Sequence, residues 1–121
     1  MISRTKLYSK AEVDRLTAGG DSYVRTSDNE VKGLALTRDK NPEAPKIIVV
    51  GVGPRIENNA ELLSHTNHPV PTFVKYGPNQ WQYKGDYRVV RYSNSFQDIE
   101  EHRKHRPASD VTGILFMEKA E

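Results

Sequence analysis

Cysteine is absent from this chain of 121 residues. Its absence excludes a disulfide scaffold, a thiol nucleophile and a cysteine-based zinc site. Long apolar runs are also missing: the longest covers residues 47–50, whereas a membrane-spanning helix needs about 18 or more. The first six residues lack the apolar stretch of a signal peptide. We therefore expect an intracellular protein without a membrane partner, in the nucleus of a eukaryote or the cytoplasm of a prokaryote.

The chain has no large excess of charge of one sign. Lys and Arg number 18 and Asp and Glu number 16, which gives a formal net charge of +2. The total charge therefore does not identify a nucleic-acid-binding protein. The composition, 36% hydrophobic and 28% charged, is typical of a polar globular domain. This length predicts one domain over residues 1–121, or one domain of a longer protein.

Local patterns predict about six or seven short strands and two or three short helices. Ser9 followed by Glu12 is the pattern of a capping box, and it predicts a helix start. Residues 46–52 form the strongest buried strand, and a helix capped by Glu57 or Asn58 is expected to follow. Further strands are expected at 22–26, 31–37, 70–76, 80–83, 87–92 and 110–117, with a turn or bulge at 84–86. This density of strands favours the α+β class, as a small curved sheet or partly open barrel.

Residues 70–92 combine basic and aromatic side chains. The cations in this stretch are Lys75, Lys84, Arg88 and Arg91, and the aromatics include Tyr76, Trp81, Tyr83, Tyr87 and Tyr92. Cations bind phosphate oxygens and aromatic faces stack on unpaired bases, so the stretch suits a nucleic-acid surface. A second interpretation stays open, in which the aromatics are core and the cations are solvated.

Other motifs predict little chemistry. Gly51 and Gly53 lead into residues 55–59, whose backbone amides form either a phosphate site or an ordinary helix cap. Two His-x-x-His pairs, at 65/68 and 102/105, lie in contexts that oppose a metal ion, and the basic stretch 102–106 is a second place for phosphate contact. No catalytic constellation stands out, so we expect neither an enzyme nor a cofactor.

Three segments follow one another along the chain: an asparagine-containing helix at 57–63, a Pro-Val strand at 69–75, and the run Tyr83-Lys84-Gly85-Asp86-Tyr87-Arg88-Val89. Their order, and above all the last run, resembles the SRA family (SET and RING associated, also called YDG). This run is similar to the family's Tyr-Asp-Gly-x-Tyr-x-Val strand, with Lys84 in place of an aspartate. Weaker similarity extends the resemblance to residues 9–92.

The resemblance implies a PUA-like β-barrel that binds DNA carrying a modified base and flips that base into a pocket. It also implies that Tyr87 is a core tyrosine. The family's pocket loop corresponds to residues 38–46, which contain no tyrosine, and Asp39 is the nearest counterpart of the pocket aspartate. The identity of the base therefore stays open, and a PUA-like domain that binds RNA remains an alternative.

Our leading hypothesis is a non-enzymatic reader of modified bases in double-stranded DNA. The residues expected to contact nucleic acid are Arg55, Asn58, Asn59, Lys75, Lys84, Arg88 and Arg91. Tyr76 or Trp81 is expected to stack on the base, and Asp39 to accept a hydrogen bond from it. The alternatives are a protein-interaction module on the same barrel and an accessory or catalytic domain acting on nucleic acid.

Overall fold

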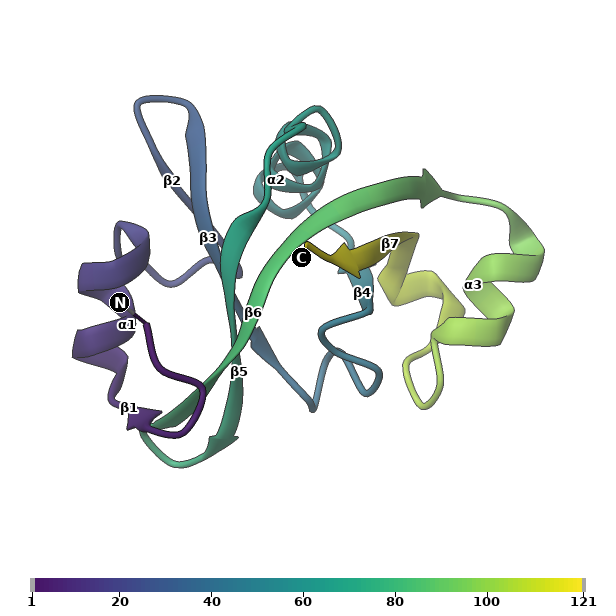
Figure 1. Ribbon diagram of the computed structural model, residues 1–121. Coiled ribbons are helices and arrows are strands. Elements are labelled where there is room, and N and C mark those ends of the chain that lie inside the picture. The colour runs from purple at the N-terminus through teal and green to yellow at the C-terminus, as the bar shows by residue number, and fades with distance from the viewer. Residues whose placement is uncertain (1, 121) are drawn as a thin grey trace.

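The computed structural model describes residues 2–120, as seven strands, three α-helices and one short 3-10 helix (Figure 1). In chain order the elements are β1 (Leu7–Tyr8), α1 (Lys10–Thr17), β2 (Val24–Ser27), β3 (Glu30–Thr37), β4 (Ile47–Gly51), α2 (Pro54–Ser64), β5 (Val70–Gly77), β6 (Gln80–Ser93), α3 (Phe96–His102), η1 (Ala108–Asp110) and β7 (Val111–Lys119). The predicted α+β class is confirmed.

All strands belong to one mixed sheet that curls into a half-barrel. The strand order is β2-β3-β5-β6-β7-β4, and the short β1 pairs with β6. The pair β3–β5 is parallel and every other described pair is antiparallel. The order places β2 and β4 at the two ends of the sheet, and we call the open side between these ends the seam. The predicted curved sheet is therefore correct in its coarse form.

Strand β6 is longer than the sequence pattern predicted. It continues through residues 84–86 and pairs first with β5 and then with β7. The pairing moves from Phe73 opposite Tyr83 to Thr72 opposite Gly85, so Lys84 is the extra residue of a bulge and not part of a turn. Gly85 has a backbone φ of +121°, a value that residues with a side chain rarely adopt. This explains why a glycine stands at the bulge.

The helices begin where their capping residues allow. The capping box of α1 is present as predicted: the Glu12 backbone N–H donates to Ser9 Oγ over 3.2 Å, and the Ser9 N–H donates to Glu12 Oε1 over 3.0 Å. Helix α2 starts earlier than predicted, with Gly53 as N-cap and Pro54 in the first turn. Proline is favoured there because its φ suits a helix and it has no N–H to leave unpaired. Glu57, predicted as a possible cap, lies inside the helix instead and accepts the Gly53 N–H over 2.9 Å.

The core has a main cluster on the face of the sheet that packs against α2, and a second cluster beneath α1. Leu34 and Leu36 of β3 belong to the main cluster, whereas Ala35 between them belongs to the second. Strand β3 is therefore buried on both faces. Tyr87 is 6% exposed in the main cluster, which confirms its predicted core position. No helix within residues 2–120 is long and apolar enough to cross a membrane.

Candidate functional site

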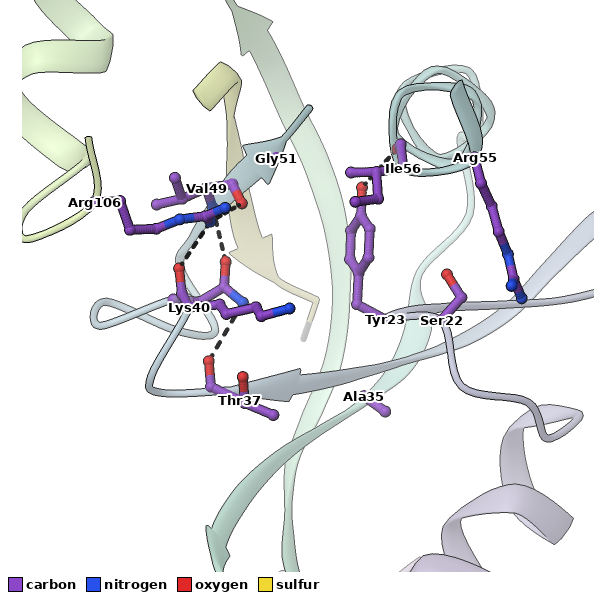
Figure 2. A pocket seen from close by; sticks show the side chains of 11 residues that line it. Ser22, Tyr23, Ala35, Thr37, Lys40, Val49, Gly51, Arg55, Ile56 and Arg106 are labelled. Carbon is purple, nitrogen blue, oxygen red and sulfur yellow. Dashed lines mark hydrogen bonds between the residues drawn. The ribbon is translucent and has the colours of Figure 1, made fainter. Parts of the chain in front are cut away.

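A cavity of about 300 Å³ opens at the seam, and we call it the seam cavity (Figure 2). Strands β3 and β4 contribute to its walls, together with the segment before β2, the start of α2, the loop after β3 and the segment after α3. The lining residues are Ser22, Tyr23, Ala35, Thr37, Lys40, Asn41, Val49, Gly51, Arg55, Ile56 and Arg106.

Asn41 bridges the seam. Its side chain is 5% exposed. Its backbone N–H and its Nδ2 both donate to the Thr37 carbonyl at the end of β3, over 2.9 and 3.3 Å. Its Oδ1 accepts the Val49 N–H from β4 over 2.8 Å (Figure 2). One side chain thus supplies the partner that the edge of β4 would otherwise lack.

Arg106 binds the same residue at the edge of β4. Its Nη1 donates to the Val49 carbonyl over 3.1 Å and to the Lys40 carbonyl over 3.3 Å, and its Nη2 lies 3.5 Å from the Asp110 carbonyl. All of these acceptors are neutral backbone groups. The guanidinium is therefore held firmly in the cavity wall, while no carboxylate of residues 2–120 pairs with its positive charge.

The seam cavity is electropositive. Lys40, Arg55 and Arg106 line it, and none of the carboxylates in the described part of the chain does. Among residues 2–120 the side chains of Lys40 and Arg55 make no hydrogen bond or ion pair, and Figure 2 shows them on either side of Tyr23. The Tyr23 hydroxyl donates to the Ile56 carbonyl over 3.2 Å, and burial raises the pKa of this hydroxyl well above its usual range. Tyr23 is therefore a neutral wall residue at physiological pH.

A wider hollow of about 570 Å³ adjoins the cavity, and we call it the Tyr76 groove. Its lining is Thr37, Arg38, Asp39, Lys40, Lys75, Tyr76, Gly77 and Pro78. Thr37 and Lys40 line both hollows, so the two are neighbours on the surface. Tyr76 is 64% exposed, and the Arg38 guanidinium carbon lies 5.7 Å from its ring centroid. The structure thus brings together three residues that the sequence predicted for nucleic-acid contact: Asp39, Lys75 and Tyr76.

Trp81 does not join this groove. Its side chain is 6% exposed and packs with Tyr8 and Phe73 in the second core cluster. The cause is the pairing of β1 with β6, which sets Tyr8 directly opposite Trp81 and covers the indole. Trp81 is therefore a core residue, as the competing interpretation had it, and its buried ring presents no open face to a base in this structure.

The predicted cations of β6 lie outside both hollows and already have partners. Arg88 pairs with Glu118 of β7 over 3.0 Å. Arg91 pairs with Asp98 over 3.2 Å and stands 3.8 Å from the Phe116 ring centroid. Lys84 Nζ lies 3.4 Å from Gln82 Oε1. Their role in phosphate contact stays a prediction.

The two predicted asparagines of α2 differ in position. Asn58 is exposed on the helix. Asn59 donates from Nδ2 to Ser22 Oγ over 2.7 Å, so it supports the segment before β2 that forms one wall of the seam cavity. Arg55 lies on the cavity rim, where the sequence placed a polar loop beside the two glycines.

Sequence reasoning missed the Asn41 bridge and two of the three cations of the seam cavity, Lys40 and Arg106. Arg106 was visible only as part of the basic stretch 102–106, and nothing distinguished Asn41 from any other polar loop residue. His102 is held by Glu43, 2.7 Å from its Nδ1, and by Glu101, 3.2 Å from its Nε2. Within residues 2–120, no three His, Cys, Asp or Glu side chains are grouped so that they could hold a metal ion.

No family model, curated protein or solved structure matches this chain. The resemblance to the SRA family therefore stays a prediction from the sequence.

Proposed function

We propose that this chain binds nucleic acid at the seam, with the seam cavity receiving a base turned out of its stack and the Tyr76 groove holding the adjacent strand. One observation carries the proposal. The two linings together contain five cations and one carboxylate, whereas the chain as a whole is nearly balanced at +2. The cations are Arg38, Lys40, Arg55, Lys75 and Arg106, and the carboxylate is Asp39. Such a local excess suits the phosphates of a nucleic-acid strand.

The aromatic and polar residues support the same function. Tyr76 presents most of its ring to solvent, and stacking of a base on an aromatic ring contributes about 1–3 kcal/mol. The seam cavity is at the small end of ligand pockets, which suits a single base rather than a larger ligand. Asp39 lines the groove and not the cavity, so we assign it to the nucleotide next to the flipped one.

Duplex DNA with a modified base is the partner we propose, because a base must leave the stack before a cavity can enclose it. The resemblance to the SRA family points in the same direction. RNA and single-stranded DNA are the competing partners, because the cations of the seam would attract the phosphates of either.

A binding titration with matched variants tests the proposal. Fluorescence anisotropy would be measured with labelled modified duplex, unmodified duplex, single-stranded DNA and RNA, each at two salt concentrations. The variant Arg38→Gln with Lys75→Gln should weaken binding to every strand and reduce the salt slope by about 2, since about one unit is lost per phosphate contact.

The control removes the same number of charges outside the seam. Arg88→Gln with Arg91→Gln breaks the pairs with Glu118 and Asp98, and neither arginine lines the cavity or the groove. This variant should bind with an affinity close to that of the wild type. If the control lost more affinity than the seam variant, the interface would have to be assigned to β6. Absence of salt-dependent binding to any strand would overturn the proposal in favour of a protein-interaction module.

A further inference from the structure

The seam cavity offers far more hydrogen-bond donors than acceptors. Besides its three cations, it contains the Ser22 hydroxyl, whose oxygen already accepts the Val24 N–H over 3.3 Å and Asn59 Nδ2 over 2.7 Å. With its oxygen occupied, the hydroxyl is left to donate its proton. Arg106 keeps N–H groups beyond those that hold the β4 edge, because a guanidinium has five.

Acceptors in the cavity are few and mostly occupied. The Asn41 Oδ1 accepts from Val49, and the Thr37 carbonyl accepts from Asn41. The Tyr23 hydroxyl donates its proton to the Ile56 carbonyl, which leaves its oxygen as one weak acceptor. Of the carboxylates in the loop after β3, Glu43 is held at His102, and Asp39 lines the groove. A base edge rich in amino groups would therefore find few partners inside the cavity.

We infer, on the basis of the proposed function, that the seam cavity selects a base that carries a negative charge, and specifically a pyrimidine with a carboxylate substituent. Ala35, Val49 and Ile56 supply apolar contact for the ring, and Lys40, Arg55 and Arg106 are the lining cations that can donate to the substituent. Hydrogen bonds between ions are about twice as strong as neutral ones, so the charged substituent gains most from this wall. A methyl substituent gains none of these bonds.

A phosphate of the strand carries the same chemistry as a carboxylate, so the experiment must separate the two sources. Three duplexes would be compared that differ at one position only, with 5-carboxylcytosine, 5-methylcytosine or cytosine. Each duplex has the same phosphates, so the affinity ratio between them reports the base alone. Competition by 5-carboxy-2′-deoxycytidine, 2′-deoxycytidine 5′-monophosphate and inorganic phosphate would then show which anion enters the cavity.

The carboxylated duplex should bind at least about tenfold more tightly than the methylated one, the change expected for one added charged hydrogen bond. Arg55→Gln should reduce this ratio severalfold. Arg15→Gln should leave the ratio unchanged, because Arg15 is an exposed arginine of α1 that lines neither hollow. The carboxylated nucleoside should compete better than the monophosphate.

Three results overturn the inference and leave the proposed function standing. The first two are equal or weaker binding of the carboxylated duplex, and competition by inorganic phosphate as strong as that of the carboxylated nucleoside. A ratio that survives Arg55→Gln unchanged also overturns it, because the selecting charge would then lie elsewhere. Absence of salt-dependent binding to every duplex and single strand overturns both proposals together.

Discussion

At the scale of single residues, Asn41 links two strands of the open sheet that are not paired with each other. It is buried, and its two polar groups join the end of β3 to the free edge of β4. Without this side chain, the Val49 N–H would face the cavity with no protein partner, and the Thr37 carbonyl would lose one of its two hydrogen bonds from Asn41. A buried donor that loses its acceptor costs about 1–3 kcal/mol.

We therefore expect Asn41→Ala to lower the free energy of unfolding by about 1–3 kcal/mol in urea denaturation. Asn41→Asp separates the two bonds, since it keeps an oxygen for the Val49 N–H but replaces the donor to the Thr37 carbonyl by a second oxygen. A smaller loss than in the alanine variant would assign most of the stability to the Val49 bond. The negative charge that Asn41→Asp adds should also weaken nucleic-acid binding at the seam. If the alanine variant were as stable as the wild type, the bridge would have no energetic role.

Trp81 and Tyr76 form a natural pair of tests, because one aromatic is buried and the other exposed. Trp81→Ala should destabilise the fold by about 3–5 kcal/mol, as expected for removal of a large core ring. Tyr76→Ala should leave thermal stability nearly unchanged while reducing affinity for DNA. Unaltered melting of the Trp81 variant would show that the indole is not packed as the structure has it.

At the scale of elements, local chemistry explains which predictions succeeded. The capping box of α1 needs only Ser9 and Glu12, three residues apart, so the sequence alone predicted it. The start of α2 was placed too late because Glu57 and Asn58 resemble N-caps, whereas Pro54 fixes the first turn. Strand β6 was divided because Gly85 resembles a turn residue, whereas pairing with β5 carries the strand through a bulge.

The same capping box makes a prediction about pH. The backbone N–H of Ser9, and then the ammonium of Lys6, hold the pKa of the Glu12 carboxyl at about 2, below its ordinary 4.5. A lowered pKa means that the ionised form is favoured by folding. Its contribution to stability is complete above pH 4.5 and is lost as the pH falls toward 2.

Glu12→Gln should therefore lower the melting temperature at neutral pH, and the gap between wild type and variant should close on acidification from pH 4.5 toward 2. The comparison of the two proteins cancels the contributions of other carboxylates, including Asp98, whose pKa is also lowered, by hydrogen bonds from Ser93 and then Arg91. A gap that stayed constant across this pH range would contradict the assignment.

At the scale of the whole molecule, the site could not be derived from sequence because its parts are far apart in the chain. Lys40, Arg55 and Arg106 line one cavity only because the fold places β4 across the seam from the end of β3. The basic stretch of β6 was conspicuous in sequence, yet Arg88 finds its partner Glu118 thirty residues later. Local density of charge along the sequence therefore pointed to Arg88 and Arg91, which are already paired within the fold.

The central claim is that nucleic acid binds at the seam. Its most direct test is an NMR titration in which DNA carrying a modified base is added to the isotopically labelled chain and the chemical shifts of the backbone amides are recorded. Binding at the seam predicts that the shifts concentrate in residues 35–41, 49–56 and 75–78 and at Arg106, around the seam cavity and the Tyr76 groove. Shifts confined to residues 84–92 of β6, with the seam unchanged, would contradict the account.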